Sequence, residues 1–296
     1  MDPIGKRKIL YFISGTLTVI SLVWLSFFRI SWGIDFAGGT LSEWQFKQPI
    51  DAKVIEKQLD ELKIKDLKVQ ATGGNGQGII VKFAGTNSED YQRVSAKLKG
   101  VGESQEVRLE SVGPTVGKSF RWKAIWAIGL ASLAIILYIA WAFRQVPKPA
   151  NSWLFGLAAI IALLHDLIIS LGLWAILAKI FGWQLDALII VALLTILGFS
   201  VHDTIVVFDR TRENLRRYPW LKYEKVINDS LLQTLTRSIN TSLTLILVLT
   251  ALVIFGGDTI RHFIAILLIG TICGTYSSIF IASPLLVTLL RNKPKI

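Results

Sequence analysis

Residues 153–178 read WLFGLAAIIALLHDLIISLGLWAILA, an apolar run whose ionisable side chains are His165 and Asp166. A helix rises about 1.5 Å per residue and the hydrocarbon core of a bilayer is about 30 Å thick, so this run is long enough to cross a membrane. Mean hydropathy over the 296 residues is +0.52, which supports the same class. Further long apolar runs lie at 9–28, 123–143, 185–208, 238–256 and 262–290. The sequence therefore predicts a membrane all-α six-helix bundle.

Residues 31–121, between the first two runs, are polar and interrupted by glycines. Apolar alternation predicts strands near 41–46, 67–71, 79–83 and 107–112, and helices are expected from Asp51 and from Thr86 or Ser88. The order β-α-β-β-α-β indicates an inserted α+β ferredoxin-like extracytoplasmic domain. The chain then divides into 1–30 (N-terminus and first span), 31–121 (external domain) and 122–296 (spans two to six with their loops).

Basic residues predict the orientation of the spans. They gather before the first run, after the second, between the fourth and fifth, and at the C-terminus. Because short cytoplasmic loops are enriched in Lys and Arg, both termini are expected in the cytoplasm. The segment 209–237 is expected to be a cytoplasmic loop, partly helical along the membrane surface and anchored by Trp220 and Tyr223. The net charge of +11 is spread over these loops, so nucleic-acid binding is not expected.

Ionisable groups inside the apolar runs are candidates for function, since each costs at least about 2.5–3.5 kcal/mol at the centre of a bilayer. Asp203 lies in the fourth run and Arg237 opens the fifth. A buried carboxyl group favours its protonated form and a nearby Arg favours its charged form. If the two groups approach and separate, Asp203 would bind and release a proton. The alternative is a static ion pair that fixes packing, and the spacing does not decide between the two interpretations.

Further polar residues of the spans are expected to support these two. Asn240 and Thr241 follow Arg237 on one helical face, and Asp166 is expected to be a hydrogen-bonding group. His165 and His202 each precede an Asp, and adjacent residues point about 100° apart on a helix, so neither pair resembles a metal site. No catalytic residue, metal or cofactor is expected, and Gly270-x-x-x-Gly274 predicts close helix contact.

Several segments together strongly resemble the SecD/SecF family of membrane proteins. They include Gly33-Ile-Asp-Phe-Ala-Gly-Gly39-Thr40, the run from Gly198 to Asn214 that contains Val-His-Asp203-Thr, and Thr234-Leu-Thr-Arg237-Ser. The short external domain favours the SecF branch. The resemblance implies that Asp203 and Arg237 take part in ion coupling. The other motif positions that match are Gly33, Asp35, Gly38, Gly39, Asp209 and Arg210.

The resemblance also implies a function, which is a non-enzymatic one. A SecF-like subunit would couple proton or sodium flow to late, ATP-independent steps of protein export in the cell inner membrane. Its expected partners are SecD, the SecYEG channel with the SecA motor, a YajC-like subunit and preproteins. Many relatives carry Asn where this chain has His202, which leaves the coupled ion open. The alternatives are a small-molecule or lipid exporter of the resistance-nodulation-division superfamily, and a passive translocon scaffold.

Overall fold

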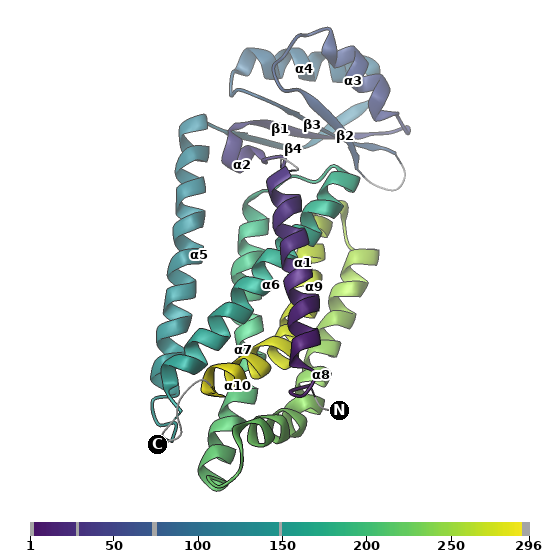
Figure 1. Cartoon of the computed structure of the whole chain (residues 1–296). Helices are drawn as coiled ribbons and strands as arrows, with labels where there is room; N and C mark the ends of the chain where they lie inside the picture. The colour runs from purple at the N-terminus through teal and green to yellow at the C-terminus, as the bar shows by residue number, and fades with distance from the viewer. Residues whose placement is uncertain (1–2, 28–29, 73–75, 148–149, 292–296) are drawn as a thin grey trace.

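The computed structural model describes residues 3–27, 30–72, 76–147 and 150–291. Within these ranges six helical segments are long and apolar enough to cross a membrane, as the sequence predicts. In Figure 1 they form one bundle with the α/β domain at one end. They are α1 (Arg7–Phe27), α5 (Pro114–Ala142), α6 (Ser152–Phe181), α7 (Ala187–Arg217), α8 (Tyr223–Phe255), and a sixth made of α9 (Asp258–Ser277), the π-helical η1 (Ser278–Ala282) and α10 (Ser283–Arg291).

The sequence predicts a partly helical loop over 209–237, and the structure shows more helix there than expected. Helix α7 continues to Arg217 and α8 begins at Tyr223, so only a short turn joins them. Ion pairs one turn apart support the charged end of α7, such as that of Asp209 with Arg212 at 2.6 Å, and Leu215 is buried there. Trp220 lies in the turn and is 74% exposed.

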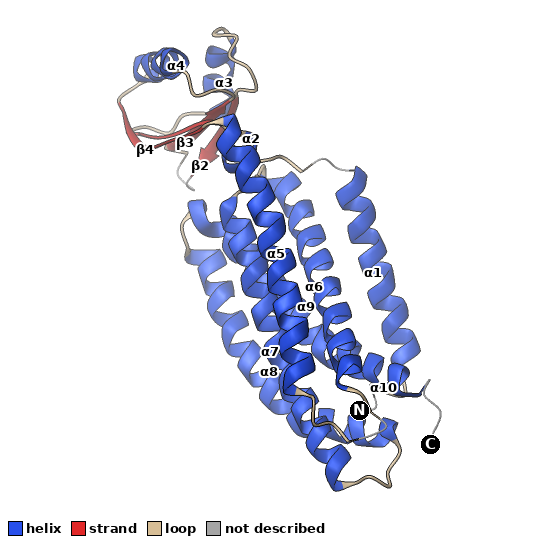
Figure 2. Cartoon of the chain, turned by 90° about the vertical axis from the view of Figure 1, so that its left-hand side faces the viewer, coloured by secondary structure: helices blue, strands red, loops and turns tan. Residues whose placement is uncertain are grey.

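The α/β domain has the predicted ferredoxin-like topology, an antiparallel sheet in the order β2-β3-β1-β4. Its elements are β1 (Gly39–Phe46), α3 (Ala52–Asp60), β2 (Lys68–Thr72), β3 (Gly78–Phe83), α4 (Ser88–Val101) and β4 (Ser104–Val112). Asp51 caps α3 as expected by accepting from the Lys53 amide, whereas Asn87 caps α4. Helices α3 and α4 cover one face of the sheet, and the other face turns toward the bundle (Figure 2).

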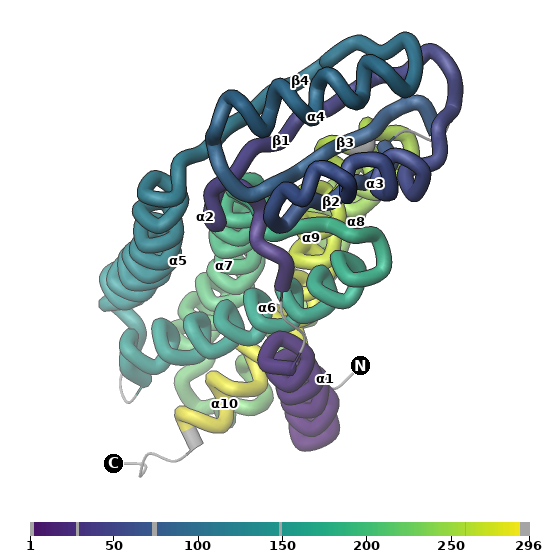
Figure 3. The backbone as a smooth tube through the Cα atoms, turned by 90° about the horizontal axis from the view of Figure 1, so that it is seen from above, coloured from purple at the N-terminus to yellow at the C-terminus, as the bar shows by residue number. Residues whose placement is uncertain are grey.

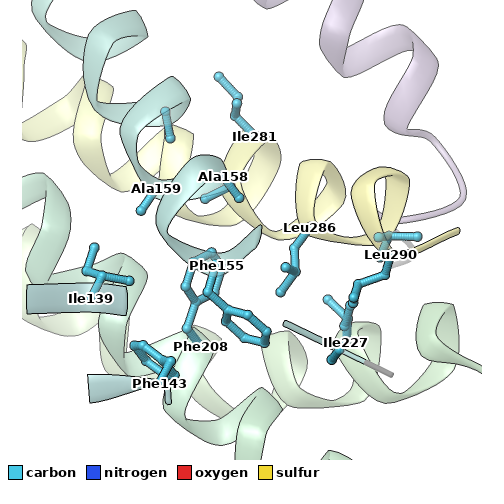
Figure 4. Packing of buried hydrophobic residues seen from close by; sticks show 14 of the residues in the cluster. Ile139, Phe143, Phe155, Ala158, Ala159, Phe208, Ile227, Ile281, Leu286 and Leu290 are labelled. Carbon is cyan, nitrogen blue, oxygen red and sulfur yellow. The ribbon is translucent and has the colours of Figure 1, made fainter. Parts of the chain in front are cut away.

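The bundle is not packed evenly. Helices α6, α7 and α9 carry most of its buried residues, while α1 and α5 lie at its edge (Figure 3). At the end remote from the α/β domain, Phe143 stacks on Phe155 with ring centroids 5.3 Å apart. Phe208 of α7 meets Phe155 edge-on at 5.2 Å, and Leu286 of α10 belongs to the same cluster (Figure 4). This apolar cluster fixes the ends of the helices that carry the buried carboxylates.

Candidate functional site

Asp166 joins three helices inside the bundle. Its side chain has no exposed surface, and its Oδ2 accepts hydrogen bonds of 2.5 Å from Ser200 of α7 and 2.5 Å from Ser277 of α9. Its Oδ1 lies 3.0 Å from Nδ1 of His165 on the same helix. A buried carboxyl group needs such partners, because an unsatisfied one is costly. The structure thus places Asp166 and His165 in one polar network.

This network continues toward α1. The ring of His165 stacks on Tyr276 with centroids 6.4 Å apart, and the Tyr276 hydroxyl lies 3.1 Å from Oγ of Ser14. The second ring nitrogen of His165, Nε2, is buried and has no hydrogen-bond partner among the described residues. Most buried polar atoms have a hydrogen-bond partner, so this unsatisfied nitrogen is an unusual feature of the network.

Asp203 forms a second polar point, between α7 and α8. It is 2% exposed, and its Oδ2 accepts a hydrogen bond of 3.1 Å from Ser242 of α8. Asp203 follows Ser200 by three residues on α7, so both lie on one face of that helix. Helix α7 therefore carries one buried carboxylate, Asp203, and contacts the other, Asp166, through Ser200.

Arg237 does not pair with Asp203 in the part of the chain that the structure describes. Arg237, Asn240 and Thr241 are all exposed on α8, whereas Ser238 and Ser242 are buried on its other face. His202 is also exposed, next to Asp203 on α7. The static ion pair considered as one interpretation is therefore not formed within this chain. Instead, α8 presents a polar stripe on the outside of an apolar bundle.

The adjacent glycines Gly38 and Gly39 of the motif near the first span have a clear structural reason. Gly38 has φ = 78° and Gly39 has φ = 135°, backbone angles that residues other than glycine rarely adopt. A Cβ on Gly38 would lie 2.8 Å from Cα of Pro114, and a Cβ on Gly39 would lie 2.6 Å from the carbonyl oxygen of Phe83. These glycines let the start of β1 pass against β3 and the start of α5.

The same motif connects the domain to α7. The short helix α2 (Ile34–Ala37), which the sequence did not predict, carries Asp35. Oδ2 of Asp35 accepts a hydrogen bond of 2.8 Å from the amide of Ala187, the first residue of α7. The amide of Gly33 donates to the Leu185 carbonyl at 2.7 Å. A carboxylate at a helix N-terminus also interacts favourably with the helix dipole.

The sequence analysis did not predict a contact that the structure shows at this position. Nε2 of His262 lies 2.8 Å from Oδ2 of Asp186, whose Oδ1 caps α7 by accepting from the amide of Ile189. The signal that could have found it is the placement of an Asp immediately before an apolar run, which is typical of an N-cap.

The remaining motif residues lie at the other end of α7. Asp209 pairs with Arg212, and Arg210 donates to Gln233 of α8 at 2.5 Å and to Glu213 at 2.6 Å. The Arg210–Gln233 bond joins α7 to α8, and the other two pairs lie within α7, away from the buried carboxylates. Across the described ranges, no group of three or more His, Cys, Asp or Glu is placed to hold a metal ion.

Helices α7 and α9 approach closely where the sequence predicts it. A Cβ on Gly270 would lie 2.2 Å from Cδ1 of Ile196, and a Cβ on Gly274 would lie 3.1 Å from Cα of Ser200. This close approach allows Ser200 and Ser277 to reach the same oxygen of Asp166.

Comparison with known proteins agrees with this architecture. Residues 93–292 match the family described as protein export membrane protein SecD/SecF, C-terminal, and residues 23–50 match the SecD/SecF GG motif. The chain is 45% identical over 300 residues to the protein translocase subunit SecF of Thermobaculum terrenum, covering 97% of this chain and 93% of that protein. It is 42% identical over 293 residues to the same subunit of Anaerolinea thermophila, with the same coverage.

Solved structures show the same fold. The crystal structure of SecDF, a translocon-associated membrane protein from Thermus thermophilus, matches with a TM-score of 0.86 and 29% identity, covering 99% of this chain. A crystal structure of SecDF in a super-membrane-facing form matches with a TM-score of 0.70 and 30% identity. This chain spans 39% of the length of each of those chains.

The matches cover the motif glycines, the α/β domain and the helices that carry Asp166 and Asp203. SecF relatives at more than 40% identity over nearly their whole length show the class of this protein. It is a multi-pass translocase subunit rather than an enzyme. The chain belongs to the SecD/SecF family of protein-export membrane proteins, as a SecF member.

Proposed function

We propose that this SecF chain couples proton movement to a late, ATP-independent step of preprotein export, in complex with SecD and beside the SecYEG channel and SecA motor. The orientation that goes with this proposal places both termini in the cytoplasm of the cell and the α/β domain outside the inner membrane. Asp203 and Arg237 are the coupling residues in this proposal.

The environment of Asp203 is the observation that carries the proposal. Its side chain is 2% exposed inside an apolar span, and its one hydrogen bond between side chains comes from the neutral hydroxyl of Ser242. No cation lies within ion-pair distance of it among the described residues. A buried carboxylate without a counter-charge is costly, and taking up a proton removes that cost. Helix arrangement and protonation of Asp203 are therefore linked.

Arg237 supports the expectation of a partner subunit. An arginine and the polar residues Asn240 and Thr241 on the outside of a membrane helix would face lipid in an isolated chain. Covering this stripe with another protein removes that cost. SecD is the natural candidate, since the matching solved structures contain SecD and SecF together in SecDF. In the complex, Arg237 would pair with an acidic group of the partner.

The Asp166 network supports this proposal because it is connected to Asp203 through α7. Ser200 touches Asp166 and lies one turn from Asp203 on α7, so a rotation of α7 would change both environments together. A proton that moves through a potential of 100 mV releases about 2.3 kcal/mol, which is enough to bias such a rearrangement.

The test is preprotein translocation into vesicles that contain this chain with SecD, SecYEG and SecA, with and without an imposed proton gradient. Asp203→Asn keeps the shape of the side chain and removes its charge, and Asp229→Asn is the matched control on α8. Equal membrane levels of all variants are confirmed first. We expect the gradient to accelerate completion in the wild type and the control but not in Asp203→Asn. If Asp203→Asn keeps the full acceleration, the proposal is wrong.

A further inference from the structure

A cavity of about 460 Å³ lies between the sheet and the bundle. One wall is the bundle-facing side of β2 and β3, and the other is the last turns of α6 with the residues that follow it. The polar side chains of the lining include Lys68, Lys82, Lys179, Gln70, Gln184 and Glu56. The cavity is large enough for a small-molecule group and lies outside the buried carboxylate network.

The lysines of this cavity lie close together. Lys68 and Lys82 are directly opposite each other in the antiparallel pairing of β2 with β3. Like charges in that position destabilise a sheet. Lys179 adds a third positive charge from α6, and among the described residues that line the cavity the one carboxylate is Glu56. An anion between the strands would offset this repulsion.

The carboxylates of Asp186 and Asp35 and the cations of Lys68 and Arg108 all lie near Lys82, so its charge is only partly offset. Its Nζ donates a hydrogen bond of 2.9 Å to the neutral side chain of Gln184. Lys179 lies with its Nζ 5.5 Å from the centre of the Trp24 ring, which holds this cation at the rim. The cationic groups thus come from both walls and are oriented before any ligand binds.

The other part of the cavity is apolar. Ala175 and Ala178 belong to the last turns of the membrane-spanning α6, and Trp183 follows its end. Tryptophan is typical of the boundary between hydrocarbon and headgroups. The cavity therefore has lysines toward the domain and apolar residues toward the membrane, which matches the order of groups in a phospholipid.

We propose that this cavity binds the phosphate headgroup of an anionic phospholipid, with the phosphate between Lys68, Lys82 and Lys179 and the acyl chains along α6. The walls are already joined by two hydrogen bonds, Lys82 to Gln184 and Gln70 Nε2 to the Phe181 carbonyl at 3.2 Å. A bound headgroup would add a third connection and hold the α/β domain against the bundle.

The test uses the full chain, purified in detergent and titrated with short-chain phosphatidylglycerol while native mass spectrometry reports bound lipid. Phosphatidylcholine and inorganic phosphate are titrated in parallel. We expect one phosphatidylglycerol to bind more tightly than phosphatidylcholine. The double variant Lys68→Gln/Lys82→Gln should raise the dissociation constant for phosphatidylglycerol roughly thirtyfold, since each lysine near an anionic headgroup contributes to the binding free energy.

Two further variants keep the test decisive. Lys53→Gln/Lys97→Gln removes the same charge from α3 and α4, on the other side of the sheet, and should leave binding unchanged. Lys68→Arg/Lys82→Arg keeps the charges and should retain binding, which excludes a general loss of folding. Equal phosphatidylglycerol binding in Lys68→Gln/Lys82→Gln and the wild type would overturn the proposal. Inorganic phosphate that binds as tightly as the lipid would show a free-phosphate site and overturn the lipid assignment.

Discussion

Ser277 of α9 and Asp166 of α6 are joined by a hydrogen bond of 2.5 Å, and Ser200 of α7 donates a second bond of 2.5 Å to the same Oδ2. Three transmembrane helices therefore meet at one oxygen atom. Removing the donor of a hydrogen bond to a buried acidic group lowers the stability of the protein more than removing a donor at the surface. The reason is that the oxygen left without a partner stays buried.

The first prediction concerns these two donors. Ser200→Ala and Ser277→Ala should each lower the free energy of unfolding by about 1–3 kcal/mol, measured as thermal unfolding in detergent. The effects of the double variant should not be the sum of the single ones, since both donors share one acceptor. Ser238→Ala is the control, because the Ser238 hydroxyl is buried without a partner in the described chain. A control loss as large as that of Ser277→Ala would contradict this account.

The second prediction concerns Gly39. Gly39→Ala forces a side chain into φ = 135° and brings its Cβ to 2.6 Å from the Phe83 carbonyl, so the start of β1 must move. We expect a loss of at least about 1–2 kcal/mol and faster proteolysis of the α/β domain in membranes. Gly100→Ala, near the end of α4 with no atom within 4 Å of the added Cβ, should be tolerated. Equal protease resistance of the two variants would refute the argument.

The third prediction concerns pH and Lys82. Burial lowers the pKa of Lys82 from its ordinary value, and nearby Asp186 opposes the shift only in part. Between the lowered pKa and the ordinary one, the unfolded chain binds more protons than the folded chain, so this group makes stability rise with pH across that alkaline window. The melting temperature is measured against pH in an uncharged detergent. Lys82→Met should remove this contribution to the slope, and Lys53→Met should not. An unchanged slope in Lys82→Met would show that another group is responsible.

The α/β domain and the number of spans could be predicted because they depend on local periodicity. Residues such as Ile55 and Leu59 recur at helical spacing, and Ile79, Val81 and Phe83 alternate as in a half-buried strand. The helix ends were less predictable, because the charged pairs that extend α7 past Asp209 carry no apolar pattern.

The site was only partly predictable for a related reason. The sequence indicates that Asp166 and Asp203 are buried, since both lie in apolar runs. It does not indicate that Asp166 meets serines from two other helices, because those contacts depend on helix rotation and close approach. The separation of Arg237 from Asp203 was equally hidden, since both residues lie in spans and only packing decides which face each one occupies.

The fourth prediction concerns the polar stripe of α8. Arg237→Leu replaces an exposed cation by an apolar side chain, so an isolated chain should be at least as stable in detergent as the wild type. If SecD covers the stripe, the same variant should recover less SecD when the complex is purified from membranes. Ile239→Ala, another exposed position of α8, is the control. Full recovery of SecD with Arg237→Leu would place the interface elsewhere.

The fifth prediction tests the close approach of α7 and α9. A Cβ on Gly270 would lie 2.2 Å from Cδ1 of Ile196, so Gly270→Ala should lower the free energy of unfolding by about 1–3 kcal/mol. Ile196→Ala vacates the same space, so the double variant should be more stable than the sum of the two single losses predicts. Gly129→Ala of α5, with no atom within 4 Å of its added Cβ, should cost little. Additive losses in the double variant would mean that Gly270 is not held against Ile196, and that Ser200 and Ser277 are brought to Asp166 by other contacts.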